Sequence, residues 1–240
     1  LEYDRSFLAA RILLDKINAN MIISGAFGLF EKKTVIAVGG YDNSTMGADM
    51  ELIERLHEFC RTNRKLYKIH FAQDAICWSQ TPEKLSELCR QRKRWQRGLF
   101  QCMWGHRKML ANPRYGAVGL LSYIYFLFYE LLSPFIELFG VLSMVLSVMM
   151  DMLNAKFMLA FLACYALYGV LLTLTAYFSR IYTIDQKLSF LELILAIVAC
   201  FFETTFLRFY LAFVRVTAFV GYKKNKLNWD KLERKKMNRI

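Results

Sequence analysis

The chain has 240 residues, of which 56% are hydrophobic, and it carries 32 Lys and Arg against 20 Asp and Glu. Residues 117–222 hold only 5 of these basic and 6 of these acidic side chains. So long a stretch with so few charges, rich in Leu, Phe and Tyr, is not typical of a soluble domain. The composition also excludes a disordered chain, collagen and a coiled coil. It indicates a membrane protein with a polar N-terminal part and a basic tail.

The first residues, Leu1 to Arg5, include no Met and no signal-like region. We therefore expect the chain to be the C-terminal piece of a longer protein. Its six cysteines form no Cys-x-x-Cys pair, and its three histidines show no metal-ligand spacing. This pattern predicts small hydrophobic cysteines in a reducing compartment and gives almost no support for zinc or serine-hydrolase chemistry.

Apolar residues recur at three- and four-residue spacing over 3–17, which predicts a helix. An apolar run with two glycines at 22–30 predicts a strand around a tight bend. Alternating strands and helices indicate an α/β domain of which only the last part is present. The other elements predicted in this region are helices at 32–38 and 50–61 and strands at 67–71 and 75–78. The helix at 50–61 is expected to expose its charges and to bury Leu52, Ile53, Leu56 and Phe59.

Thr81, Pro82 and Glu83 form a strong helix start, with an N-cap, a Pro at the first position and an acid in the first turn. From Leu85, apolar residues fall within a stripe roughly 100° wide, and basic residues lie opposite. Such a helix can lie in a membrane interface, although a surface helix of a soluble domain is the alternative. The apolar segment that follows favours the interface. The stripe holds Leu85, Leu88, Trp95, Leu99, Cys102 and Met103, opposite Arg90, Lys93, Arg94 and Arg97.

A second region, from Ala117, is long enough to cross a bilayer several times, since one crossing needs about 20 apolar residues. Ser133-Pro134 interrupts it. Four crossings would place the basic helix and the basic tail on the same cytoplasmic side. One tilted helix over 117–150, giving three crossings, or a re-entrant first pair remain alternatives. The four predicted segments are 117–133, 135–152, 157–178 and 188–206.

Four glutamates, Glu130, Glu137, Glu192 and Glu203, lie within these apolar segments. Carboxylates in hydrocarbon are costly, so they normally face a bundle interior or a polar path. We favour structural pairing, for example of Glu203 with Arg208, over a channel-lining role.

Two clusters in the polar part carry side chains suited to chemistry. Asp49 lies at a helix N-terminus, where the dipole stabilises a carboxylate, and this alone is common in proteins. Gln91, Arg94 and Trp95 lie at i, i+3 and i+4 along one side of a helix. They could bind a phosphorylated sugar, because Arg pairs with phosphate and Trp offers a flat face to a pyranose. A basic helix with one buried Trp is the plainer interpretation.

Together these clusters resemble the membrane-embedded glycosyltransferases of family 2, which include the cellulose, hyaluronan, chitin and poly-N-acetylglucosamine synthases. Gln91, Arg94 and Trp95 match the family's Gln-x-x-Arg-Trp motif in full. Asp49 matches the Asp of its Glu-Asp pair, but Ala48 stands in place of the Glu. The segment 24–42 also looks like the family's acceptor-side segment. The tail is similar to the ends of bacterial members through Arg208, Trp229 and Arg234.

The resemblance implies an α/β plus membrane all-α architecture. Residues 1–80 would form the acceptor-side part of a GT-A-like glycosyltransferase domain, and 81–114 an amphipathic interface helix. A transmembrane helix bundle of about four segments would follow at 115–222, and a basic cytoplasmic tail at 223–240.

The resemblance also assigns roles. Asp49 would be the general base that takes a proton from the acceptor hydroxyl as it attacks the anomeric carbon. Arg94 would stabilise the departing nucleotide diphosphate, Gln91 would help to order this site, and Trp95 would stack on the acceptor sugar. The family's Asp-x-Asp motif, which holds a divalent Mg²⁺ or Mn²⁺ ion, does not occur in these 240 residues. We expect it in the missing N-terminal part, so the fragment alone should be inactive.

The expected reaction is inverting sugar transfer from a nucleotide sugar, a UDP-sugar, to a growing glycan, for polysaccharide synthesis and its export. We expect the enzyme in a bacterial cell membrane, which it would cross several times with its catalytic face on the cytoplasmic side. We expect no nucleic acid among its partners. One alternative is a non-catalytic or degenerate membrane module that binds glycan or a partner synthase, which Ala48 favours. Another is a transporter or channel subunit, which predicts no catalytic residues clustered at the membrane surface.

Overall fold

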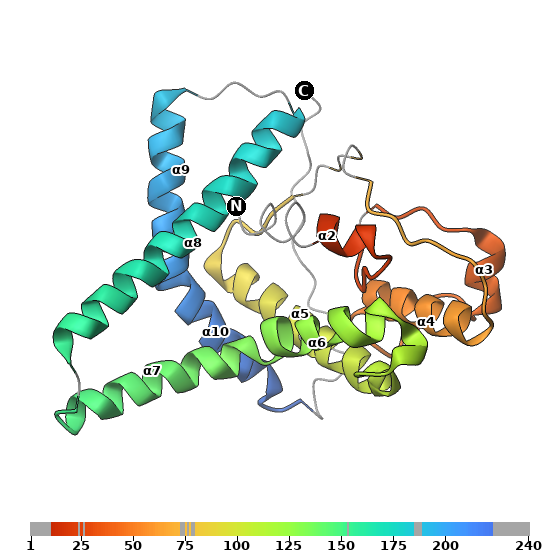
Figure 1. The fold of residues 1–240 in the computed structure, drawn as a ribbon, viewed down its shortest axis with the longest axis horizontal. Helices are drawn as coiled ribbons and strands as arrows, with labels where there is room; N and C mark the ends of the chain where they lie inside the picture. Colours follow the sequence, from red (N-terminus) through yellow and green to blue (C-terminus); the bar gives the residue numbers. More distant parts are fainter. Residues whose placement is uncertain are drawn as a thin grey trace. The chain divides into compact units, whose positions relative to one another are not determined.

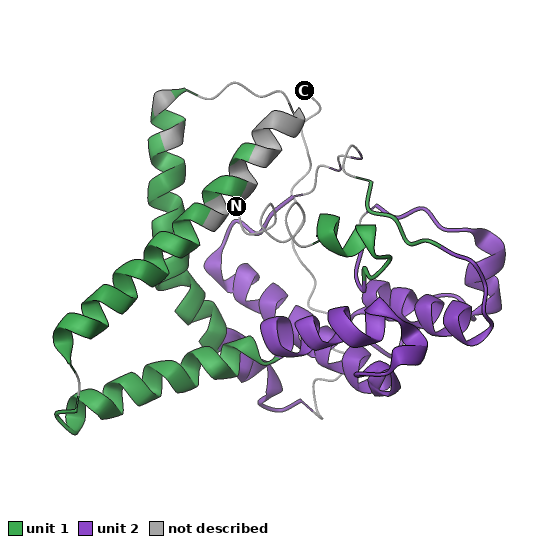
Figure 2. Cartoon of the chain, in the orientation of Figure 1, with its two compact units in different colours: residues 1–20, 68–74, 132–213 green, residues 21–67, 75–131, 214–240 purple. Residues whose placement is uncertain are grey.

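The computed structural model describes residues 11–222 except 24, 26, 73, 74, 76, 78, 79, 153 and 185–188. The chain divides into two compact units (Figure 2). The motif unit comprises residues 21–67, 75–131 and 214–240, and the apolar-helix unit comprises residues 1–20, 68–74 and 132–213. All the candidate site residues belong to the motif unit.

The motif unit is built on two long helices, α4 (Ala48–Thr62) and α5 (Leu85–Gly105), which contact each other (Figure 1). A short helix, α3 (Lys32–Ala37), precedes them. Short helical turns follow α5 and lead into the apolar sequence. These are η2 (Arg107–Met109), η3 (Pro113–Tyr115), η4 (Val118–Ser122), α6 (Tyr123–Tyr125) and η5 (Phe126–Leu131), and η7 (Thr217–Phe219) joins the unit from the end of the chain.

Helix α4 confirms the helix predicted at 50–61 and three of its four core residues, because Leu52, Ile53 and Leu56 are 0%, 1% and 7% exposed, whereas Phe59 is only partly buried. The expectation that its charged side chains face outward is wrong for Glu51 and Glu54, which are buried. Charged residues can occupy a buried helix face when a partner or a bound proton neutralises them. In α4, Glu51 pairs with Arg55 and Glu54 holds a proton.

Helix α5 begins at Leu85, three residues later than the predicted first helical residue Pro82, and Leu85 itself is 52% exposed. Cys102 and Met103 are buried, as predicted. The same side of the helix also buries the amide of Gln101, which hydropathy alone would place in water. The amide is accommodated because its oxygen accepts a backbone hydrogen bond, as the site geometry shows.

The break predicted at Ser133-Pro134 is confirmed, because α7 starts at Ser133 with Pro134 in its first turn. Pro134 has no N–H for the carbonyl of Glu130, four residues earlier, so that acceptor needs another donor. The guanidinium of Arg215 donates to it. The buried amide of Gln96 donates to the next carbonyl, that of Leu131, at 2.9 Å.

Gln96 and Arg215 also bind each other, with Nε of Arg215 donating to the Gln96 amide oxygen at 2.7 Å. One turn of α5 further on, Phe100 meets the rings of Phe219 and Tyr222 at centroid distances of 5.5 and 5.7 Å. Residues 215–222 are therefore held along one side of α5 by polar and aromatic contacts.

The apolar-helix unit is dominated by long apolar helices, and α8 packs against α9 and the turn that follows it. Gly169 permits this approach, since a Cβ there would lie 2.8 Å from Cγ2 of Thr204. Its elements are α2 (Arg11–Lys16), α7 (Ser133–Met149), α8 (Ala155–Ile184), α9 (Phe190–Phe202), η6 (Glu203–Leu207) and most of α10 (Arg208–Val216).

The structural pairing expected for the glutamates of the apolar segments is confirmed for Glu137. Its Oε1 accepts from Nε and from a terminal nitrogen of Arg208 at 3.0 and 2.6 Å. Arg208 is the partner that was expected for Glu203. The pair joins α7 to α10 within the apolar-helix unit.

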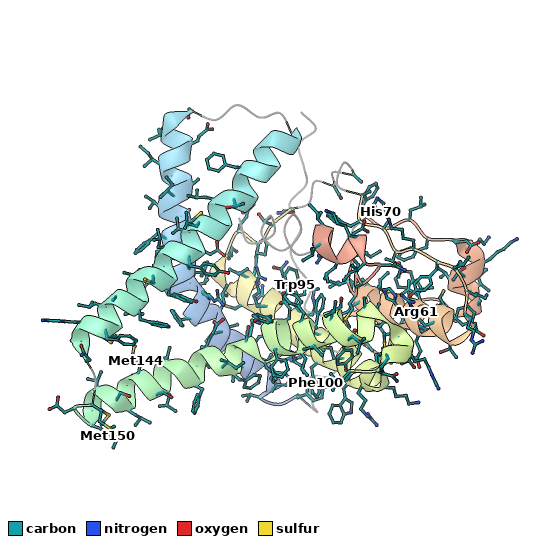
Figure 3. The ribbon with its side chains drawn as sticks, in the orientation of Figure 1. Arg61, His70, Trp95, Phe100, Met144 and Met150 are labelled. Carbon is teal, nitrogen blue, oxygen red and sulfur yellow. The ribbon has the colours of Figure 1, made fainter. Side chains whose placement is uncertain are left out.

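The described residues form no β-strand, so the strands predicted at 22–30 and 67–71 are not formed at their described positions. In the second segment, the N–H groups of Ile69 and Phe71 donate at 2.9 and 2.7 Å to the side chains of Asn18 and Asp15. Asp15 also accepts from His70, labelled in Figure 3, at 2.8 Å. The side chains of Asp15 in α2 and of Asn18 just after it therefore accept backbone hydrogen bonds that a neighbouring strand would otherwise accept. The strand predicted at 75–78 falls mostly outside the described residues.

Among the described residues, one helix, Ile194–Phe219, is long and apolar enough to cross a bilayer by itself. The segments Val118–Leu131 and Ser133–Met149 meet the same criterion only when taken together as one broken span. Ala155–Leu171 is apolar but shorter. Helices thus occupy all four predicted segments, and the number of crossings stays a prediction.

Candidate functional site

Asp49 lies in the first turn of α4, directly after Ala48, and is half-buried. The unsatisfied N–H groups at this end of the helix favour a carboxylate. Gly25 lies against it, because a Cβ at that position would come within 2.8 Å of Oδ2 of Asp49. The carboxylate is therefore in close contact with the backbone of Gly25 on one side.

The Gln-x-x-Arg-Trp motif lies in the first half of α5, and Gln91, Arg94 and Trp95 share one side of it. Trp95 is 38% exposed and is labelled in Figure 3. The guanidinium carbon of Arg92 lies 4.7 Å from the centroid of its indole ring, within range of a cation–π interaction. The indole is thus a half-exposed aromatic surface held by a neighbouring cation, and not the buried core residue of the plainer interpretation.

The loop before α4 crosses α5 at two glycines, Gly47 and Gly98. A Cβ on Gly98 would lie 2.9 Å from the Gly47 nitrogen, so the two backbones are in direct contact. Asp49 follows Gly47 by two residues, and Trp95 precedes Gly98 by three, which is within one turn of about 5.4 Å. The Asp49 helix start and the Arg94–Trp95 turn therefore both lie within about one helical turn of this contact, whereas Gln91 lies two turns from Gly98.

The end of α5 is bound to α4 by a histidine between two glutamates. Nδ1 of His106 lies 2.9 Å from Glu58, and Nε2 lies 3.5 Å from Glu51. Glu51 also pairs with Arg55 at 2.5 Å. Burial alone would lower the pKa of His106, but its hydrogen bonds to Glu51 and Glu58 raise it overall. The carboxylates on this side of α4 therefore favour the protonated form of the imidazole.

Glu54 differs from its neighbours because it has no exposed surface and neither carboxyl oxygen has a hydrogen-bond partner. Burial raises the pKa of Glu54 to about 8, and the positive charge of His106 opposes part of this rise. The charges of Glu51 and Glu58 raise it further. A buried acid without partners is least costly when neutral, so Glu54 holds its proton at pH 7.

We predict that the stability of the full-length protein falls as the pH rises from 6 to 8, and that Glu54→Gln reduces this fall. The unfolded chain releases the Glu54 proton near pH 4.5 and the folded chain near pH 8. The stabilisation is therefore complete below pH 4.5 and is lost as the pH rises towards 8, by at most about 1.4 kcal/mol per unit. The raised pKa of His106 acts in the same direction.

The measurement is the thermal unfolding midpoint in detergent at pH 6, 7, 8 and 9. Glu87→Gln on α5 serves as a control and should keep the wild-type profile. Identical profiles for Glu54→Gln and the wild type would show that Glu54 does not hold a proton in the folded chain.

Across the described ranges, no group of three or more His, Cys, Asp or Glu side chains is placed to hold a metal ion. The acidic side chains further along α4 are occupied, Glu51 and Glu58 by His106 and Arg55, and Glu54 by a proton. These residues do not form a site for the divalent metal expected in this family, and no step proposed below depends on one.

The sequence interpretation missed the residues that connect the two motifs, namely Gly25, Gly47, Gly98 and His106. A glycine inside a helical pattern is a signal of close packing, so Gly98 was detectable in principle. Its partner, 51 residues earlier in the chain, was not.

Comparison with known proteins supports the resemblance. The family model described as "Glycosyl transferase family group 2" matches residues 1–214. Poly-beta-1,6-N-acetyl-D-glucosamine synthase of Staphylococcus aureus (strain COL) is 34% identical over 90 residues, which are 38% of this chain and 19% of that protein. The protein of the same name from Staphylococcus epidermidis is 33% identical over the same shares. The match thus spans about a fifth of the length of these relatives, and no solved structure matches significantly.

Proposed function

Because the chain belongs to glycosyl transferase family group 2, we propose that it forms the acceptor-side and membrane half of an inverting glycosyltransferase. The enzyme would move a sugar from a nucleotide sugar to a growing glycan at the cytoplasmic face of a bacterial membrane. The observation that carries this proposal is the crossing of Gly47 and Gly98, which joins the Asp49 helix start to the Arg94–Trp95 turn.

In this proposal Asp49 is the general base. The acceptor hydroxyl becomes acidic only as its oxygen bonds to the anomeric carbon, so a positioned carboxylate must take the proton at that moment. The bond from the anomeric carbon to the diphosphate oxygen breaks in the same step, and negative charge grows on the leaving group. The guanidinium of Arg94 would stabilise that charge, and Gln91 would orient the diphosphate.

The donor class follows from the relatives, which are named as synthases of poly-beta-1,6-N-acetyl-D-glucosamine. We propose UDP-N-acetylglucosamine as the first donor to test and an N-acetylglucosamine polymer as the acceptor. The apolar segments would cross the membrane four times and guide the polymer outward, with residues 223–240 on the cytoplasmic side.

The test is incorporation of radiolabelled sugar by the full-length protein in sealed inside-out vesicles, across a panel of UDP-sugars. The proposal expects polymer from UDP-N-acetylglucosamine above background, and inversion at the anomeric centre. A full-length protein that is folded and inserted but transfers none of the sugars would favour the second candidate. That candidate is a non-catalytic module that binds glycan, which the replacement of the family's Glu by Ala48 supports.

We predict that Trp95→Ala weakens use of the acceptor more than hydrolysis of the donor. Taking the roughly 1–3 kcal/mol known for an aromatic side chain stacked on a nucleobase as a guide to the indole on a pyranose ring, transfer should fall about 5- to 150-fold. Donor hydrolysis needs no acceptor sugar and should change much less. The measurement is the ratio of polymer formed to UDP released at saturating donor.

The matched control for Trp95 is Trp104→Ala on the same helix, where the indole stacks on Phe100 at 6.0 Å and is 60% exposed. It should leave the ratio of transfer to hydrolysis at the wild-type value. Equal loss of transfer and hydrolysis in Trp95→Ala would instead assign the Trp95 indole a purely structural role.

A further inference from the structure

We propose that Gly98 and Gln101 of α5 are positioning residues that hold the catalytic base against the Gln-x-x-Arg-Trp helix. This inference rests on the proposed function of Asp49 as the base. It concerns two residues outside the motif, one turn apart on the same side of α5, which contact the loop that leads into Asp49.

The first contact is steric. A Cβ on Gly98 would lie 2.9 Å from the Gly47 nitrogen and 3.1 Å from its Cα, both of them backbone atoms. Backbone cannot move aside as a flexible side chain can, so any larger residue would push the loop away from α5. Only glycine at position 98 allows this spacing.

The second contact is polar. The amide oxygen of Gln101, itself 8% exposed, accepts from the backbone N–H of Met46 at 2.8 Å. The thiol of Cys102 donates to the carbonyl of Gly47 at 3.2 Å. Burial raises the pKa of Cys102, so it stays a thiol and remains a donor. Two successive residues of α5 therefore bind the backbone of two successive loop residues, Met46 and Gly47, which lie three and two residues before Asp49.

The third contact fixes the direction of α4. His106, which directly follows the last residue of α5, bridges Glu51 and Glu58, which are two turns apart along α4. A rigid helix held at its start by Gly98 and Gln101 and along its length by His106 cannot shift its first turn independently. Displacing a base by about 1 Å can cost on the order of 100-fold in rate, so removing these contacts should lower kcat.

The experiment compares Gly98→Ala with Gly105→Ala in the full-length enzyme. Gly105 lies on the same helix, and an added Cβ there meets nothing within 4 Å, so the second variant controls for the change in helix propensity. We expect Gly98→Ala to lower kcat roughly 10- to 100-fold with the donor KM within about twofold of wild type. Gly105→Ala should retain both values.

A second pair of variants keeps the proposal testable if Gly98→Ala fails to fold. Gln101→Met keeps the volume but removes the acceptor for the Met46 N–H, whereas Gln101→Glu keeps an acceptor oxygen. We expect kcat to fall about tenfold in Gln101→Met, since one buried backbone N–H loses its partner, and to recover in part in Gln101→Glu. A merely structural role would instead lower the amount of folded enzyme and leave kcat per folded molecule unchanged.

A readout independent of activity is hydrogen exchange at the amides of residues 46–49. Exchange should quicken in Gly98→Ala and Gln101→Met and stay at the wild-type rate in Gly105→Ala. Unchanged exchange, or an unchanged kcat in an active enzyme, overturns the positioning proposal alone. A wild-type enzyme that transfers no sugar, with exchange at 46–49 that still responds to these variants, overturns the proposed function and leaves the contact established.

Discussion

Replacing Asp49 by Asn in the full-length enzyme is expected to lower kcat for sugar transfer by about 10²–10⁴-fold, the usual contribution of a general base. The amide has almost the same shape as the carboxylate, so the space left by Gly25 and the contacts of Gly47 should be preserved. What is lost is the group that accepts the hydroxyl proton. Donor binding should change little, because no role in it is assigned to Asp49.

The measurement is kcat and donor KM in vesicles, with membrane insertion checked by the yield of folded protein. Asp151→Asn, an exposed change of the same kind between α7 and α8, should leave both values as in the wild type. Unaltered turnover in Asp49→Asn would remove Asp49 as the base while leaving the family assignment intact.

The second large effect is expected at the ion pair of Glu137 and Arg208. Glu137→Leu should destabilise the full-length protein by about 3 kcal/mol, since it leaves a guanidinium without its carboxylate among apolar helices. Arg208→Leu should destabilise the protein by a similar amount, because the carboxylate of Glu137 then lacks its guanidinium partner. The double variant should recover most of the loss, because an ion pair and a well-packed apolar pair can be nearly equal in stability.

Thermal unfolding of the four proteins in the same detergent gives this double-mutant cycle. Lys156→Met, which removes an exposed charge near the start of α8, should leave the midpoint unchanged. If the two single losses simply add in the double variant, Glu137 and Arg208 do not interact energetically, and the role of Glu137 would have to be sought along a polar path instead.

The helices were largely predictable from the sequence because their signals are local. The 3.6-residue period identified α4 and α5, and Pro134 marked the start of α7, since a missing N–H acts on its own chain neighbours. The strands were not predictable in the same way. A strand requires a partner distant in the chain, and in the described residues the N–H groups of Ile69 and Phe71 bond side chains more than 50 residues away.

The same difference between local signals and contacts distant in the chain applies to the candidate site. The roles of Asp49, Arg94 and Trp95 came from a family resemblance, which carries no geometry. The contacts that join them depend on pairs such as Met46 with Gln101, which are 55 positions apart and leave no local pattern. The burial of Glu54 was missed for a further reason, since hydropathy treats every glutamate as charged and this one is neutral in the fold.

The hydrogen bond between Arg215 and Gln96 has a consequence for the synthesis of the protein. The two side chains are separated by 119 positions, so the ribosome releases Gln96 long before the arginine that completes its bonding. Until then, the amide oxygen of Gln96 lacks the Nε donor of Arg215, and the carbonyl of Glu130 lacks the guanidinium that binds it in the folded chain. Final assembly should therefore wait until residue 215 has been synthesised, and a gene shortened to stop before that codon should yield a product that the cell's proteases remove.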